Sequence, residues 1–141
     1  MKNFAIALTL CTAVSTVSAQ AEETSLEGKI GVELNATQTQ EANCKLTFVI
    51  TNGLGKDAHA VYETVLFDTE GQVNRLTLFD FGKLPFGRPR VRQFEIANLQ
   101  CEKLGRVLFN GAHACAGEGI DATKCESGLH LSTRTSVEVL G

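Results

Sequence analysis

The stretch Cys44-Lys45-Leu46-Thr47-Phe48-Val49-Ile50-Thr51 decides the fold of this 141-residue chain. Cys44, Leu46, Phe48 and Ile50 share one parity and are all apolar, which is the period of a β-strand that packs one face against a core. The following residues, 52–57, form a cluster of turn-forming types (Asn-Gly-Leu-Gly-Lys-Asp) that ends the strand. This segment therefore predicts a half-buried strand with Cys44 on its core side.

Six further segments have the same character, being short, apolar and separated by turn residues. With 44–51, the predicted strands are 29–34, 60–67, 73–81, 90–96, 105–109 and 129–140. No segment keeps a 3.6-residue period between helix caps. The pattern predicts an all-β domain over 29–141, an antiparallel immunoglobulin-like β-sandwich of about seven strands. The Trp that marks antibody-type cores is missing, because the chain contains no Trp.

Residues 1–19 have the form of a secretory signal peptide, with Lys2, an apolar run over 4–17 and the small-residue exit Val17-Ser18-Ala19. Cleavage after Ala19 and cleavage after Ala21 both stay open, and 20–28 is expected to be a flexible N-terminal arm. The run is too short to span a bilayer. It lacks the arginine pair of a Tat leader, so the Sec route is favoured. Leu10 before Cys11 does not suit a lipoprotein. The expected location is the bacterial periplasm.

Four cysteines remain after the leader, and an even number in an exported domain predicts two disulfides. In the expected sandwich, strands 44–51 and 90–96 are antiparallel neighbours, so the start of the first lies beside the end of the second. Cys44 is therefore paired with Cys101. Cys115 and Cys125 flank the next connection and are paired with each other. This is one of three possible pairings.

Composition argues against several classes of function. With 13 Lys and Arg against 16 Asp and Glu, the formal net charge is −3, which does not suit a general nucleic-acid binder. The chain has no nucleophile-elbow motif, no recognisable triad and no C-x-x-C. The sequence therefore predicts a protein that is not an enzyme and carries no cofactor.

Arg88, Arg90 and Arg92 form the first candidate site, a basic stripe able to contact an anion or a partner. The alternative is an edge strand protected by its charges and by a proline. Arg92 shares its parity with Phe94 and Ile96, which should be buried. Three explanations stay open: a side chain that snorkels at the rim, a bulge that resets the face, or a buried partner such as Glu63 or Asp80.

Two more segments carry hypotheses of function. The loop from Gly111 to Gly128 contains His113 and two cysteines, with His130 just beyond, which is a possible metal-binding set if the thiols are free. If they are bonded, the loop 115–125 is pre-organised for docking, for example as an inhibitor. The segment Leu76–Phe81 is apolar on both faces, so its outward side is a candidate contact surface if the strand lies at an edge.

The stretch Glu63–Val73, continued by Pro89–Phe94, resembles a group of small exported proteobacterial proteins that carry the label "Tat pathway signal sequence domain protein". The resemblance runs from about Cys44 to Cys115 and implies no activity. The aromatic-Asp-x-x-Gly hairpin is also similar to the FxLYD class of immunoglobulin-like domains, a likeness of fold only.

Together these features predict an exported β-sandwich that is a non-catalytic binding or accessory protein of the bacterial envelope, with an envelope protein of unknown identity as its partner. The alternatives are a small periplasmic inhibitor of a hydrolase that uses loop 115–125, and a metal-handling protein that uses His113 and His130. No nucleic acid and no membrane span are expected.

Overall fold

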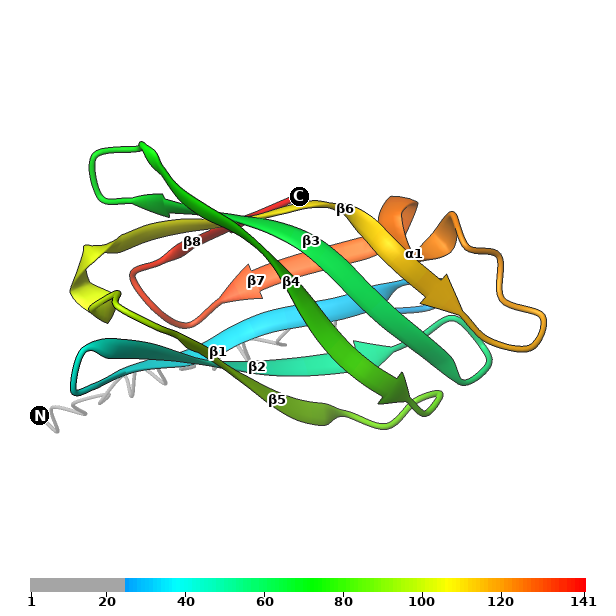
Figure 1. The fold of residues 1–141 in the computed structure, drawn as a ribbon. Helices are drawn as coiled ribbons and strands as arrows, with labels where there is room; N and C mark the ends of the chain where they lie inside the picture. Colours follow the sequence, from blue (N-terminus) through cyan, green and yellow to red (C-terminus); the bar gives the residue numbers. More distant parts are fainter. Residues whose placement is uncertain (1–24) are drawn as a thin grey trace, which may run out of the picture.

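A computed structural model describes residues 25–141 (Figure 1). Two helical turns are present, η1 (Cys101–Lys103) and α1 (Lys124–Ser127). The strands are β1 (Ile30–Gln40), β2 (Asn43–Asn52), β3 (Ala58–Asp68), β4 (Val73–Leu84), β5 (Arg90–Ile96), β6 (Leu104–Ala116), β7 (Leu129–Thr133) and β8 (Glu138–Leu140).

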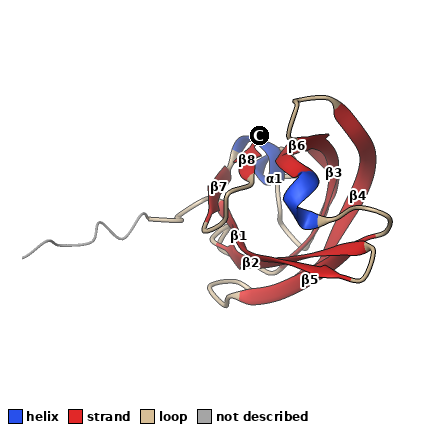
Figure 2. Cartoon of the chain, turned by 90° about the vertical axis from the view of Figure 1, so that its left-hand side faces the viewer, coloured by secondary structure: helices blue, strands red, loops and turns tan. Residues whose placement is uncertain are grey.

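The strands form two four-stranded sheets that face each other across the core (Figure 2). Their orders are β5-β2-β1-β7 and β4-β3-β6-β8. The predicted all-β sandwich is confirmed, with eight strands in place of about seven. The first six strands follow the immunoglobulin order. The strands β1, β2 and β5 lie in one sheet, and β3, β4 and β6 lie in the other.

The C-terminal strand differs from the prediction because it is divided in two. β7 pairs in parallel with β1, whereas β8 pairs in parallel with β6 in the other sheet. Hydroxyl groups make the turn between them: Thr133 Oγ1 accepts the N–H of Thr135, and Thr135 Oγ1 accepts the N–H of Val137. Such local bonds compete with a continuous ladder, and so break the strand.

Burial along β2 confirms the alternation predicted for residues 44–51. Cys44, Leu46, Phe48 and Ile50 are fully buried on β2. Phe48 lies at the centre of an aromatic cluster, with ring centroids 5.7–6.2 Å from four other phenylalanines. Edge-to-face contacts of this kind add to the gain from burial. The cluster joins both sheets through the phenylalanines Phe79, Phe81, Phe94 and Phe109.

Both predicted disulfides are present. Cys44 at the start of β2 is bonded to Cys101 in η1, with 4.8 Å between their Cα atoms. The register pairs Cys44 with Ile96 at the end of β5, so the two neighbouring strand ends meet as expected. The second bridge joins Cys115 on β6 to Cys125 in α1, with 5.9 Å between Cα atoms.

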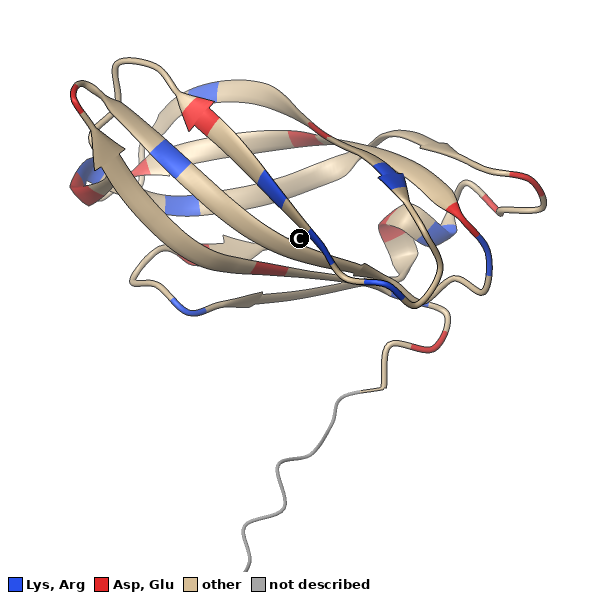
Figure 3. Cartoon of the chain, turned by 90° about the horizontal axis from the view of Figure 1, so that it is seen from below, with Lys and Arg blue, Asp and Glu red and all other residues tan. Residues whose placement is uncertain are grey.

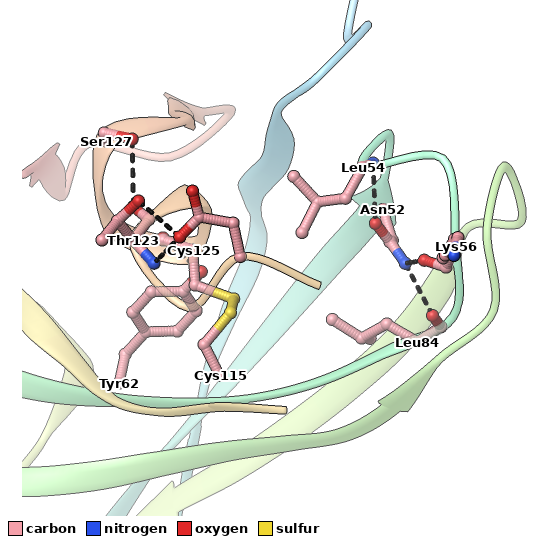
Figure 4. Close-up of a disulfide and its surroundings, with 10 residues drawn as sticks. Asn52, Leu54, Lys56, Tyr62, Leu84, Cys115, Thr123, Cys125 and Ser127 are labelled. Atoms are coloured by element: carbon pink, nitrogen blue, oxygen red, sulfur yellow. Dashed lines mark hydrogen bonds between the residues drawn. A yellow bond between two sulfur atoms is a disulfide. The ribbon is translucent and has the colours of Figure 1, made fainter. Parts of the chain in front are cut away.

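Two buried polar side chains fix the end of the sandwich near the second bridge (Figure 4). The hydroxyl of Tyr62 donates to the carbonyl of Cys125 at 2.8 Å, and burial raises the pKa of this phenol. Asn52 ends β2 and donates to the carbonyls of Lys56 and Leu84, both at 2.8 Å. These bonds satisfy polar groups that would otherwise be costly inside the fold.

The signal peptide predicted at 1–19 lies outside the described residues, as does most of the predicted arm at 20–28. The described part of the arm lies against the sandwich, since the N–H of Gly28 donates to the carbonyl of Gly53 at 2.9 Å. A Cβ on Gly53 would lie 1.8 Å from the carbonyl oxygen of Leu26, so this close approach requires glycine. Within 25–141, no helix is long and apolar enough to cross a membrane.

Candidate functional site

The structure explains why the charged Arg92 has the same parity along its strand as Phe94 and Ile96. This residue lies opposite Phe48 on the inward side of β5, at the rim where β5 and β4 approach each other. Its Nε donates to the carbonyl of Phe81 at 2.7 Å, and its Nη2 donates to the carbonyl of Lys83 at 3.2 Å. Of the three explanations, the rim position is therefore right, with backbone carbonyls in place of a buried carboxylate.

A bulge in β4 lies at the point where Arg92 binds the carbonyl of Phe81. The register passes from the pair Val61–Asp80 directly to the pair Ala60–Gly82, so Phe81 is the extra residue on β4. Gly82 adopts a positive φ of 66°, a conformation that favours glycine. The guanidinium group of Arg92 thus joins the edges of the two sheets.

The other two members of the arginine stripe remain near the surface. Arg88 is exposed, and Arg90 donates from Nη1 to the carbonyl of Pro89. Figure 3 shows Lys and Arg positions, in blue, spread over the side of the sandwich that is seen from below. Because Arg92 already binds carbonyls, a contact with an anion would fall to Arg88 and Arg90, and it stays a prediction.

A second charged cluster lies beside the β4–β5 corner, around a shallow pocket of about 410 Å³. His59 and Asp80 are 2.7 Å apart, and this bond, helped by the N–H of Gly82, lowers the pKa of Asp80. Among the described residues, His59 has no hydrogen bond to a hydroxyl or thiol, so the pair lacks the nucleophile of a triad. Non-enzymatic function stays a prediction.

The proposed metal ligands are not brought together. His113 lies on β6 and His130 on β7, in different sheets. Cys115 and Cys125 are bonded to each other, which removes the thiolates that the metal hypothesis needs. Across residues 25–141, no group of three or more His, Cys, Asp or Glu side chains could hold a metal ion.

The outer face of the sheet β4-β3-β6-β8 carries a continuous apolar row. The register places Leu76 opposite Val65, Val65 opposite Leu108, and Leu108 opposite Leu140, one residue from each strand. Leu76 is 62% exposed and Leu140 is 39% exposed, while Val65 between them is covered by its neighbours. Leu78, 48% exposed, widens the row on β4. We call these five residues the apolar row.

Two charged side chains beside the apolar row have partners on the same face. Arg106 Nε lies 2.6 Å from Glu138 Oε2, and the guanidinium group lies 5.5 Å from the ring centroid of Phe67. Glu63, next to the row on β3, accepts a hydrogen bond from Asn110. The face therefore offers apolar contact with little net charge, which distinguishes it from the basic β5 edge.

Part of this site was predicted from the sequence. The segment Leu76–Phe81 does lie on an edge strand, with Phe79 and Phe81 in the core and the leucines outward. Val65, Leu108 and Leu140 were missed, because their alignment depends on the register of four strands. The run Val65-Leu66-Phe67, apolar at three consecutive positions, was the available signal for a second apolar face.

Comparison with known proteins adds no relative: no family model, curated protein or solved structure matches the chain. The resemblance to the exported group and to the FxLYD class therefore stays a prediction.

Proposed function

We propose that this protein is a non-catalytic binding protein of the bacterial envelope that contacts its partner through the apolar row. The observation that carries the proposal is the alignment of Leu76, Val65, Leu108 and Leu140 across all four strands of one sheet. Single exposed leucines are ordinary on a surface, but a contiguous apolar patch is typical of an interaction site.

Two disulfides support an oxidising compartment, because such bonds persist outside the cytosol. With the leader expected at 1–19, they favour export to the periplasm by the Sec route. The domain would then meet its partner in the envelope.

The chemistry of the face defines the partner. A largely apolar sheet surface fits an extended apolar segment or another sheet, whose side chains interdigitate with the row. An acidic partner would instead be expected at the β4–β5 corner, where Lys83, Arg88 and Arg90 lie.

Leu140→Arg tests the proposal at the end of the row farthest from the β4 edge. The matched control is Val91→Arg, since Val91 is 58% exposed on the opposite sheet. After crosslinking in periplasm-containing cells, we expect the partner captured by the wild type and by Val91→Arg to be lost with Leu140→Arg. Both variants should melt like the wild type, because neither side chain is buried. Equal capture by both variants would refute the proposed surface.

The loop between Cys115 and Cys125 supports a second candidate, an inhibitor of an envelope hydrolase. Its residues 116–119 and 121–124 are exposed, while Cys125 is fully buried and held by the hydroxyl of Tyr62. A loop fixed in this way loses little entropy on docking. Replacing 117–121 with a Gly-Ser linker should abolish inhibition of periplasmic hydrolases while the apolar row keeps its partner. Inhibition that survives the replacement would exclude the loop.

A further inference from the structure

The two sheets have four edge strands, and β4 differs from the other three in its length and in its protection against pairing. β7 and β8 are short, with five and three residues. β5 carries Pro89 just before its start and charged residues along its length, the usual protection against unwanted strand pairing. β4 is twelve residues long and forms one whole side of its sheet.

Among residues 25–141, only the second half of the β4 edge is covered. There Arg92 binds the carbonyls of Phe81 and Lys83, which point away from β3. Figure 1 shows β5 close to this end of β4 and diverging from it toward the start of β4. Consistent with this, Arg75 and Thr77 are only half-buried, although they share the inward side with the core phenylalanines.

The uncovered first half of β4 has the properties of an edge that is available for pairing with another strand. Its pairing with β3 is regular from Arg75 to Asp80, between one bulge at Asn74 and another at Phe81. The segment 75–79 contains no Pro or Gly and one charged residue, Arg75 at its start, and its outer side shows Leu76 and Leu78. A regular, largely apolar edge of this kind is a template for pairing with another strand through its backbone.

We propose that the strand that pairs with this edge is β4 of a second copy, antiparallel, about a two-fold axis at Thr77. In an antiparallel pair, two opposite residues exchange hydrogen bonds only when both direct their N–H and C=O groups toward each other. For a strand and its own copy, this requires the axis to pass through a residue and not between two residues.

The side chains select which residue lies on the axis. With Thr77 on the axis, Leu76 faces Leu78 of the second copy and Leu78 faces its Leu76. An axis at Leu78 would set Leu76 against Asp80, and an axis at Leu76 would set Leu78 against Asn74. Only the register at Thr77 matches both leucines with leucines, and it also pairs threonine with threonine on the inner side.

This dimer goes beyond the proposed function and would extend its surface. Pairing at β4 joins two four-stranded sheets into one of eight strands. The two apolar rows then meet at the axis through four leucines, so one face runs across both copies. The resulting interface is isologous, as in most homodimers.

Charge complementation at the two leucines tests the register, using the full mature chain in sedimentation velocity. Leu76→Lys/Leu78→Glu places Lys opposite Glu twice, whereas Leu76→Lys/Leu78→Lys places Lys opposite Lys twice. Both pairs of substitutions remove the same leucines. We expect the Lys/Glu chain to dimerise at least about tenfold more tightly than the Lys/Lys chain, from the energies of cross-strand charge pairs. The wild type and Val91→Arg should both be dimers.

A wild-type chain that stays monomeric up to about 1 mM would overturn the dimer. Equal association of the Lys/Glu and Lys/Lys chains would overturn the register at Thr77. The proposed function fails separately, since Leu140→Arg lies at the far side of the sheet and should leave the dimer intact. A wild-type chain that stays monomeric but still captures its partner would therefore refute the dimer and leave the proposed function standing.

Discussion

Arg92→Met removes the guanidinium group that joins the two sheet edges. Methionine keeps an unbranched apolar stem opposite Phe48. The change removes the two hydrogen bonds to β4 and an exposed one from Nη1 to the carbonyl of the adjacent Val91. The bond to the carbonyl of Phe81 is half-buried and 2.7 Å long, and the bond to the carbonyl of Lys83 is exposed and 3.2 Å long.

The two bonds have unequal weight. A hydrogen bond from a charged donor contributes about 1.5–3 kcal/mol when it is protected from water, and much less when it is exposed. We therefore expect the free energy of unfolding to fall by about 2 kcal/mol, nearly all of it from the contact with Phe81. For a domain of this size, such a loss lowers Tm by about 8 °C.

Urea unfolding followed by circular dichroism measures this loss, with Arg90→Met as the matched control. Arg90 lies two residues earlier on the same strand and bonds only to the carbonyl of the adjacent Pro89, so its replacement should cost less than about 0.5 kcal/mol. Arg92→Lys should fall between the two, because an ammonium group lacks the fork that reaches both carbonyls. Equal losses for Arg92→Met and Arg90→Met would refute this account of the corner.

Three further predictions concern stability. Removing the long bridge with Cys44→Ala/Cys101→Ala should lower the free energy of unfolding by about 4 kcal/mol, since it closes a loop with a sequence separation of 57 residues; a loss below about 1 kcal/mol in urea unfolding would contradict this. Tyr62→Phe should cost about 1–2 kcal/mol because the buried Cys125 carbonyl loses its donor, and an unchanged urea midpoint would argue against the bond. Folding lowers the pKa of Asp80 below its usual 3.8, so the ionised carboxylate stabilises the folded state above pH 3.8. This stabilisation is lost as the pH falls through the pKa of Asp80 in the folded state. Exposure limits the effect to at most about 1 kcal/mol, and thermal melts from pH 7 to pH 2 should show a shallower acid decline for Asp80→Asn than for the wild type.

The fold was largely predictable because it depends on local periodicity. The alternation from Cys44 to Ile50 defines which side of β2 is buried, and that side has no exposed surface in the fold. Once seven segments were assigned as strands, neighbouring strand ends predicted the pairing of Cys44 with Cys101 and left Cys115 for Cys125. Topology supplied what cysteine spacing alone does not.

The remaining features depend on contacts between distant residues. The division of the last strand follows from hydroxyl bonds of Thr133 and Thr135 with nearby backbone N–H groups, which an alternating pattern does not reveal. Arg92 broke the polarity pattern of β5 because its partners are carbonyls on β4. The apolar row was hidden for a related reason: its members are far apart in sequence and meet only through registers that two bulges in β4 and three irregularities along β6 adjust.

The contrast between the two halves of the β4 edge links these observations. The same strand meets an arginine that covers its carbonyls at one end and presents Leu76 and Leu78 at the other. If the whole edge were selected only for solubility, a lysine in place of either leucine would protect it without loss of core packing, since both side chains point outward. The leucines instead continue a row that crosses three more strands. Under the proposed function, the exposed half of β4 is one end of the binding surface, and under the proposed dimer Arg92 confines pairing to that half.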